Sequence, residues 1–421
     1  MTSREKVRRA LAHQPGPVPV DFGSTGLTGM HVSCVAALRE HYGLPRHPVK
    51  VSEPFQMLGE IEDDLARLLG SDCTGANGRG TMFGFPAEDW HEWRAPWGQE
   101  VLVPGGFRPR EEAGNIYLFP TGDPTVPPSG HMPAGGYFFD AIVRQQPIDE
   151  DKLDPADNCE EFTLLAPEDL AHWRREFARL QGETRAVVSG IGGTGFGDIA
   201  LVPAAFLKHP RGIRDVTEWY VSLIERRDYV HAIFTKQCEV ALQNLATFAA
   251  IAGDTVDVLF LCGTDFGTQT SQFCSPATFD ELYAPYYRQV NDWVHRHTKW
   301  KTFKHSCGAV RPLIDRFIAC GFDILNPVQC SATDMDPGRL KADFGDRLVF
   351  WGGGVDTQHT LPFGTPAAVR TQVTERLRAF SPHGGFVFNT IHNVQARTPV
   401  ENIVAMVDAI RDFNGTPASS P

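Results

Sequence analysis

The chain has 421 residues, with 39 basic and 51 acidic side chains and a formal net charge of −12. Because 42% of the residues are hydrophobic and 21% charged, the chain can bury a full core, which excludes general disorder. The acidic balance argues against nucleic-acid binding. No stretch approaches the roughly 18 apolar residues of a membrane span, and the charged start MTSREKVRRALAHQ is no secretory signal. Nine cysteines without a CxxC pair fit a reducing compartment, so we expect a cytoplasmic protein that contacts neither nucleic acid nor membrane.

The predicted elements alternate between short strands and amphipathic helices after a charged N-terminal helix. The apolar segments with strand character are residues 18–22, 71–75, 186–191, 256–261, 302–305, 322–326, 348–352 and 385–389. Helices are predicted at 54–69, 216–250, 276–297, 310–320, 366–380 and 399–413, several of which open with proline near the first turn.

Eight strand-then-helix units predict an α/β fold of the (β/α)8 TIM-barrel type, which needs about 250 residues. The surplus includes a long irregular insertion between early strands, at about 80–156, rich in glycine, proline and tryptophan. We therefore expect one barrel domain over 1–421. A doubly wound sheet with a second domain is the competing interpretation. Polar clusters after so many different strands favour the barrel, because barrel active sites lie at the carboxyl ends of the strands.

The most specific pattern is KHSCG, which contains His305 and Cys307 at the end of an apolar strand. Alternation along an extended chain places residues i and i+2 on one side, so both side chains would face the barrel mouth. Imidazole nitrogen and thiolate sulfur are ligands that zinc favours. From the spacing alone, a buried thiol beside a hydrogen-bonded histidine remains the alternative.

His392, in FNTIHNVQARTP, is the candidate third ligand. Catalytic zinc sites use three protein ligands and leave a position for water or substrate. The alternative is a histidine that is hydrogen-bonded within its own loop.

Other polar groups follow the strands. Asp265, in TDFGTQ, is the candidate catalytic residue, as a general base or as a carboxylate that orients a metal-bound histidine, with a helix cap as the alternative. Residues expected to line the substrate site are Asp21, Gln269, Asn326, Gln329, Trp351 and Asp356.

The pattern Gly190-x-Gly192-x-x-Gly195 formally matches a dinucleotide-binding fingerprint. The acidic residue expected about 20 positions further on is missing, so we interpret the pattern as a tight barrel loop.

The C-terminal half resembles the uroporphyrinogen decarboxylase superfamily. The stretches that carry the resemblance are FGTQTSQFCSPATFDELYAPYYRQVNDWVH, KHSCGAVRPLIDRFIACGFDILNPVQ, RLVFWGGGVDTQ and GGFVFNTIHNVQARTPVENIVAMVDAI, with weaker similarity at REKVRRALAHQPGPVPVDFGS. The resemblance implies a single (β/α)8 barrel, in agreement with the unit count.

Two branches of that superfamily imply different chemistry. The decarboxylase branch uses no metal and binds a tetrapyrrole with many carboxylates, marked by an arginine-containing RQAGR-like segment after the first strand. Here that segment is VDFGSTGLTG, which has no arginine. The zinc-dependent, cobalamin-linked methyltransferase branch is marked by a His-x-Cys pair, matched by His305 and Cys307, and by a late cysteine, in whose place this chain has His392.

The resemblance therefore implies a zinc-dependent methyltransferase of the demethylase type. It would move a methyl group between the heteroatom of a small methoxy or thiol compound and a corrinoid (cobalamin). A separate corrinoid protein is the implied partner, because this chain has no recognisable corrinoid domain, and a homodimer is favoured. A metal-free decarboxylase or lyase acting on a small carboxylated substrate is the first alternative, and a binding protein without turnover is the second.

Overall fold

The computed structural model describes residues 1–416, so the last five residues of the domain expected over 1–421 lie outside the described range. Its central feature is a curled seven-stranded parallel sheet in the order β15-β14-β13-β12-β11-β10-β3. The strands are β3 (Cys73–Ala76), β10 (Ala186–Ser189), β11 (Val258–Cys262), β12 (Lys301–His305), β13 (Ile324–Asn326), β14 (Val349–Trp351) and β15 (Phe386–Val387). This sheet confirms the predicted TIM-barrel type of fold and seven of the eight predicted strands.

The remaining predicted strand, at 18–22, is wrong because this segment does not form a regular strand. Its backbone nevertheless lies where a strand would close the barrel. Val20 forms a single parallel bridge to Phe388, and its carbonyl accepts from the amide of Asp72 at 2.7 Å. The segment therefore lies between β15 and β3, the two edge strands of the sheet, and hydrogen-bonds on both sides. Pro17 and Pro19 have no amide hydrogen, so a regular ladder cannot form along this segment.

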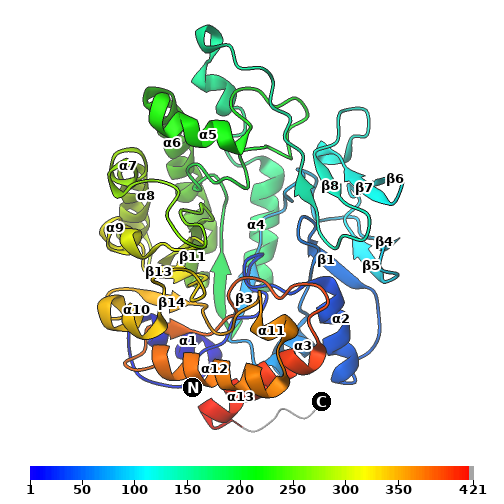
Figure 1. Cartoon of the computed structure of the whole chain (residues 1–421), viewed down its shortest axis with the longest axis vertical. Helices are drawn as coiled ribbons and strands as arrows, with labels where there is room; N and C mark the ends of the chain where they lie inside the picture. The colour runs from blue at the N-terminus through cyan, green and yellow to red at the C-terminus, as the bar shows by residue number, and fades with distance from the viewer. Residues whose placement is uncertain (417–421) are drawn as a thin grey trace.

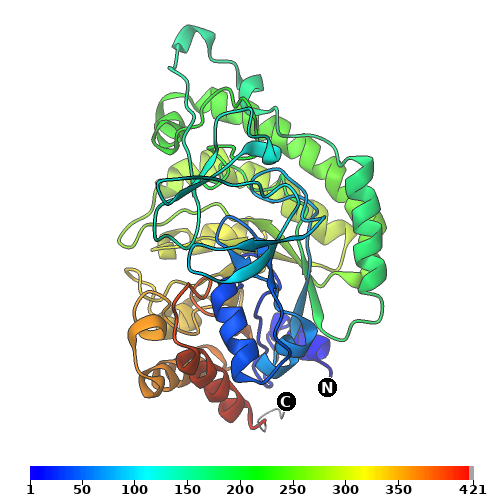
Figure 2. The ribbon, with the colours of Figure 1, turned by 90° about the vertical axis from the view of Figure 1, so that its right-hand side faces the viewer.

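Helices cover the outside of the sheet, as Figures 1 and 2 show. The longer ones are α1 (Ser3–Leu11), α2 (Val32–His41), α4 (Pro167–Arg179), α5 (Val216–Glu225), α6 (Arg227–Ala252), α8 (Ala284–His297), α10 (Pro337–Phe344), α12 (Pro366–Phe380) and α13 (Val400–Asn414). The shorter ones are α3 (Asp63–Leu69), α7 (Pro276–Thr278), α9 (Ile314–Ala319) and α11 (Thr360–Phe363). Proline occupies the first turn of α4, α10 and α12, where its missing N–H costs nothing.

One predicted helix, 54–69, is wrong over its first half. The Glu53 carboxylate accepts hydrogen bonds from the amides of Phe55 and Gln56 at 2.8 and 2.7 Å, which stabilises a turn. The chain then forms the short strand β2 (Leu58–Gly59), and helix begins only at Asp63. Between this turn and β2, Met57 adopts a left-handed conformation (φ +54°), which a right-handed helix cannot contain.

The insertion at 80–156 is more regular than its sequence indicated. It contributes β4 (His91–Arg94) and β5 (Glu100–Val103) to a four-stranded sheet with β2 and β1 (Val49–Glu53), in the order β2-β1-β5-β4. A second, antiparallel sheet contains β6 (Arg110–Glu112), β7 (Asn115–Leu118), β8 (Gly130–Met132) and β9 (Asp140–Ala141). Both sheets lie beside the barrel at the right of Figure 1. Strands this short show no period in the sequence, which is why the composition pointed to loops.

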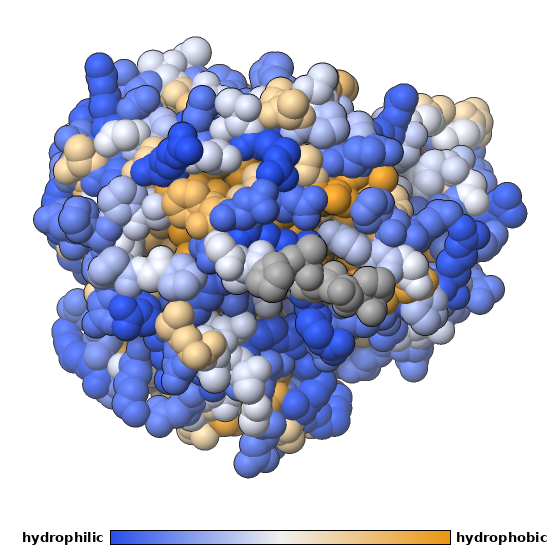
Figure 3. Space-filling model, turned by 90° about the horizontal axis from the view of Figure 1, so that it is seen from below, coloured by the Kyte–Doolittle hydropathy of each residue, from blue (hydrophilic) through white to orange (hydrophobic). Residues whose placement is uncertain are grey.

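The α1 helix covers the end of the barrel at which the strands begin. Lys6 pairs with Asp72, just before β3, and Arg8 pairs with Asp257, just before β11, both at 2.7 Å. Seen from this end, the surface is mainly hydrophilic, and its larger hydrophobic areas lie in the middle between polar rims (Figure 3). Across residues 1–416, the structure contains no helix with both the length and the apolar character that crossing a membrane requires.

Candidate metal centre

The structure brings His305, Cys307 and His392 together at the opposite end of the barrel, where the strands finish. His305 is the last residue of β12, and Cys307 follows two residues later. His392 lies in the loop after β15. One potential ligand atom from each of the three side chains lies within 4.8 Å of the other two. Two imidazoles and one thiol therefore converge from segments far apart in the sequence.

The orientation of the His305 ring follows from its hydrogen bonds. The Nδ2 amide of Asn326 donates to the carbonyl of Trp351 at 2.8 Å, which leaves Asn326 Oδ1 as the acceptor facing His305 Nδ1 at 2.5 Å. Nδ1 of His305 is thus the protonated nitrogen, and Nε2 carries a lone pair directed at Cys307. Nε2 lies 3.4 Å from Cys307 Sγ. Burial lowers the pKa of His305 to about 4, so the ring is neutral at physiological pH, as metal ligation requires.

Asp265 fixes the position of Cys307. Its Oδ1 accepts from the backbone amide of Cys307 at 2.6 Å and lies 3.8 Å from His305 Nε2. Burial raises the pKa of the Cys307 thiol well above its ordinary value, and the nearby Asp265 carboxylate raises it further. The thiol is therefore protonated in the absence of a cation, and a metal ion would provide the positive charge that a thiolate needs.

Two glycines allow the loops after β11 and β12 to touch. Gly308 has a φ of +86°, and a Cβ there would come within 2.3 Å of the backbone carbon of Gly267. The amide of Gly308 donates to Gln329 Oε1 at 2.8 Å. Gln329, a predicted substrate contact, thus supports the Cys307 loop from the neighbouring β13 end.

His392 has a different environment from His305. Its backbone has a φ of +69°, and its Nδ1 accepts from the amide of the next residue, Asn393, at 2.9 Å. The ring centroids of His392 and His305 lie 5.3 Å apart at 74°. Burial lowers the pKa of His392 to about 4, so this ring is also neutral. A metal would have to compete with the Asn393 amide for Nδ1 or displace the proton on Nε2.

The other predicted site residues divide into buried and exposed groups. Trp351 donates from Nε1 to Asp21 Oδ2 at 3.0 Å, and both side chains are buried. Burial raises the pKa of Asp21 to about 6. The Asp356 carboxylate accepts from the amides of Gln358 and His359 at 2.6 and 3.0 Å and thereby stabilises a turn. Gln269 is exposed, and its carbonyl accepts from the Thr333 amide at 3.0 Å.

Sequence reasoning missed Lys304, a fully buried cation next to His305. Its Nζ donates to the carbonyls of Thr264 and His305 at 2.6 and 2.8 Å and lies 4.7 Å from the centre of the Phe266 ring. Alternation along β12 places this side chain on the face opposite to His305, which the KHSCG pattern already implied. Lys304 ties the ends of β11 and β12 together beneath the site.

The donor set fits zinc. Tetrahedral zinc with nitrogen at about 2.0–2.1 Å and sulfur at about 2.3 Å places neighbouring ligand atoms roughly 3.3–3.6 Å apart. The His305–Cys307 separation of 3.4 Å already meets this requirement. The 4.8 Å limit on the whole group means that His392 has to approach by at most about 1.5 Å. The oriented histidine, with its amide partner, is the arrangement that usually supports a zinc ligand.

Comparison with known proteins agrees with this architecture. Residues 203–413 match the family described as uroporphyrinogen decarboxylase (URO-D). This range includes β11–β15 and the three converging residues. This chain belongs to the URO-D family.

Curated relatives match over shorter stretches. The uroporphyrinogen decarboxylase of Azoarcus sp. (strain BH72) is 36% identical over 80 residues, which is 19% of this chain and 22% of that protein. The uroporphyrinogen decarboxylase of Anaeromyxobacter dehalogenans is 25% identical over 183 residues, or 44% and 48% of the two chains. The matches thus span between about a fifth and a half of these relatives.

Among solved structures, a methyltransferase from Methanosarcina mazei is similar over nearly the whole length. The match has a TM-score of 0.53 at 17% sequence identity and covers 98% of this chain and 99% of that one. This likeness supports the barrel fold.

Proposed function

We propose that this protein is a zinc-dependent methyltransferase of the demethylase type. It would transfer a methyl group between the heteroatom of a small methoxy or thiol compound and a corrinoid carried by a separate protein. The observation that supports this proposal is the convergence of His305, Cys307 and His392, with His305 Nε2 directed at Cys307 Sγ. Cys307 is a half-buried thiol beside a neutral, oriented imidazole, and thiolate sulfur and imidazole nitrogen are ligands that zinc favours.

In this proposal His305 and Cys307 hold the metal, and His392 completes the set. When bound, zinc would either lower the pKa of a substrate thiol or act as a Lewis acid on an ether oxygen. Asp265 keeps Cys307 in place through the 2.6 Å bond to its amide, and Asn326 keeps His305 Nε2 unprotonated. Burial of His305 and Asn326 limits access of water to this side of the site.

The predicted substrate contacts receive more specific roles. Asn326 and Gln329 position the metal-binding loop, and Asp21 and Trp351 form a buried polar pair inside the barrel. Exposed Gln269, and Asp356 on its turn, remain the predicted contacts to the substrate or the corrinoid partner. The homodimer stays a prediction.

The test is methyl transfer to cob(I)alamin from a panel of methoxylated and methylthio compounds. We expect transfer with zinc-loaded protein, loss of transfer after removal of metal by a chelator, and recovery on addition of zinc. A chelator-treated protein that releases carbon dioxide from a carboxylated pyrrole or aromatic compound, and that shows no methyl transfer, would contradict the proposal. It would favour the decarboxylase alternative, consistent with the curated relatives.

A further inference from the structure

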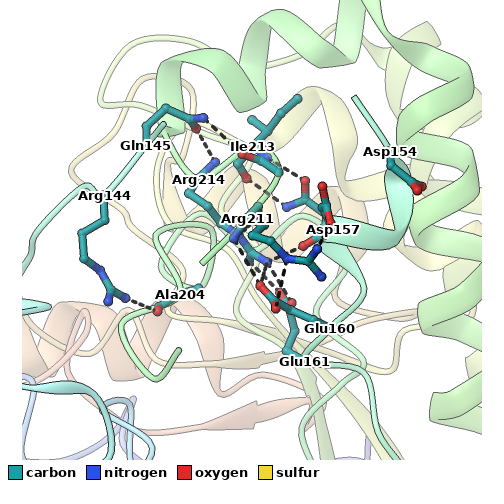
Figure 4. Close-up of polar contacts among 12 residues, drawn as sticks. Arg144, Gln145, Asp154, Asp157, Glu160, Glu161, Ala204, Arg211, Ile213 and Arg214 are labelled. Carbon is teal, nitrogen blue, oxygen red and sulfur yellow. Dashed lines mark hydrogen bonds and ion pairs between the residues drawn. The ribbon is translucent and has the colours of Figure 1, made fainter. Parts of the chain in front are cut away.

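Most basic side chains of this protein have a carboxylate partner. Arg214, 1% exposed, donates to both carboxylate oxygens of Glu161 at 2.9 and 3.1 Å (Figure 4). Seven of the nine lysines lie at most 3.9 Å from a carboxylate oxygen. Within residues 1–416, Lys304 and Lys341 form no such ion pair. These two amines therefore differ from the others in having no counter-charge.

Only one of the two amines lies in a side chain that reaches the surface. Lys304 is fully buried beside the candidate metal centre, where its Nζ donates to the carbonyls of Thr264 and His305. Lys341 lies in α10 and is half-buried. Its Nζ donates to the carbonyl of Gly384, just before β15, so it lies at the opposite end of the barrel from the metal centre.

The surroundings of Lys341 explain why its amine is desolvated without being neutralised. The side chain lies across Gly345, where a Cβ would come within 2.5 Å of Cδ and 3.0 Å of Cε. The turn that Nζ reaches contains Gly384 and Gly385, with φ values of +74° and +66°. These glycines offer a carbonyl oxygen but no side chain that could pair with the amine. His13 also faces this region, because its Nδ1 donates to the Gly345 carbonyl at 3.0 Å.

The charges around Lys341 do not hold it in the ammonium form. Burial lowers the pKa of His13, and the positive charges of Lys341 and Lys301 lower it further, against the opposing effect of Asp346. Burial lowers the pKa of Lys341 to about 8, whereas a lysine in water has a pKa of about 10.4. At pH 7 the neutral amine is therefore roughly 200-fold more abundant in Lys341 than in a fully exposed lysine.

We propose that Lys341 is an acylation site and the lysine of this chain that reacts fastest with small acyl phosphates. The lone pair of Nζ attacks the carbonyl carbon, so an N–C bond forms and the C–O bond to phosphate breaks. Phosphate leaves with the electron pair of that bond, and one proton of Nζ passes to water. The resulting amide keeps an N–H for the Gly384 carbonyl but removes the basic charge from the last turn of α10.

The test is acetylation of the folded full-length protein by acetyl phosphate, measured for each lysine at early times by mass spectrometry of proteolytic peptides. Lys299 is the internal reference, because its side chain is 84% exposed. The nucleophilicity of an amine falls with its basicity, which offsets part of the gain in neutral amine. We expect Lys341 to react roughly tenfold faster than Lys299 at pH 7. Its rate should level off above about pH 8, whereas the rate of Lys299 should rise towards about pH 10.

Two controls separate the folded environment from the local sequence. Lys341→Arg keeps the positive charge but has no acylatable amine, so Lys299 should react in this variant at the wild-type rate. In urea-unfolded protein, where burial is lost, Lys341 and Lys299 should react equally fast. Equal rates in the folded protein, a Lys341 rate that keeps rising to about pH 10, or a preference that persists after unfolding would overturn the proposal. Because the measurement uses neither metal nor methyl donor, its outcome is independent of the proposed methyl transfer.

Discussion

Asn326 Oδ1 accepts a hydrogen bond from His305 Nδ1 across a distance of 2.5 Å, and the other end of the same amide is held by the carbonyl of Trp351. The two contacts fix which nitrogen of His305 carries the proton. They also join the ends of β12, β13 and β14. A residue that the sequence placed among substrate contacts is thus the partner that orients a candidate metal ligand.

Removal of this contact should weaken metal binding without removing a ligand. Asn326→Leu deletes the acceptor, so the His305 ring is free to rotate or to change tautomer, and we expect zinc affinity to fall by roughly 10- to 100-fold. Asn326→Asp retains an acceptor oxygen and should retain most of the affinity. Competition with a chromophoric chelator measures both values. Equal affinity of Asn326→Leu and the wild type would contradict the role given to Asn326.

The two histidines should differ in their contribution to the metal site. The partner of His305 Nε2 is the thiol of Cys307, itself a candidate ligand, whereas His392 Nδ1 is used by the Asn393 amide. We therefore expect His305→Ala to abolish stoichiometric zinc binding and His392→Ala to leave a weaker site with the metal still detectable. Equilibrium dialysis followed by metal analysis tests this order. A reversed order would show that the loop after β15 rearranges around the ion.

His31 makes the docking of the insertion sensitive to pH. Its Nε2 donates to the Tyr137 carbonyl at 3.0 Å, its Nδ1 accepts from the Ser33 amide at 3.1 Å, and burial lowers its pKa to about 4. The lowered pKa means that the unfolded chain binds the proton first. The stabilisation is therefore present above about pH 6.5 and is lost as the pH falls towards 4, by at most about 3 kcal/mol.

Urea unfolding at pH 7.5 and 5.0 measures this loss. His31→Gln should show a smaller decrease in the free energy of unfolding between the two pH values than the wild-type protein. His209→Gln changes an exposed histidine and should follow the wild type. If all three proteins lose the same stability, the neutral His31 contact contributes nothing to the pH dependence.

The Arg214–Glu161 pair should be worth much more than a surface ion pair. Glu161→Gln leaves a 1% exposed guanidinium with only the 3.4 Å contact to Glu160 as charge compensation, and we expect a loss of about 3 kcal/mol. Glu100→Gln breaks the exposed pair with Arg94 and should cost less than about 1 kcal/mol. Denaturant unfolding compares the two. Similar costs would mean that water reaches Arg214.

Much of the fold was predictable because its strands are apolar runs followed by amphipathic helices. Side chains two residues apart in an extended chain lie on one side, so the sequence also placed His305 and Cys307 together at the end of β12. Closure of the barrel was not predictable in detail, because Pro19 interrupts the ladder at the first strand. The helix expected at 54–69 failed because Met57 is left-handed (φ +54°) and residues 58–59 pair with β1 as a strand.

The parts of the site that came only from the structure depend on contacts between distant segments. No spacing in the sequence indicates that Asn326 faces His305, since both residues look alike as polar groups at strand ends.

The measurement that tests the central claim most directly is the zinc content of the purified full-length protein, determined by mass spectrometry beside that of the His305→Ala/Cys307→Ala double variant. The account predicts about one zinc per chain in the wild type and none in the folded double variant. Absence of zinc from wild-type protein purified without chelator and then supplied with zinc, or equal zinc in both proteins, would contradict it.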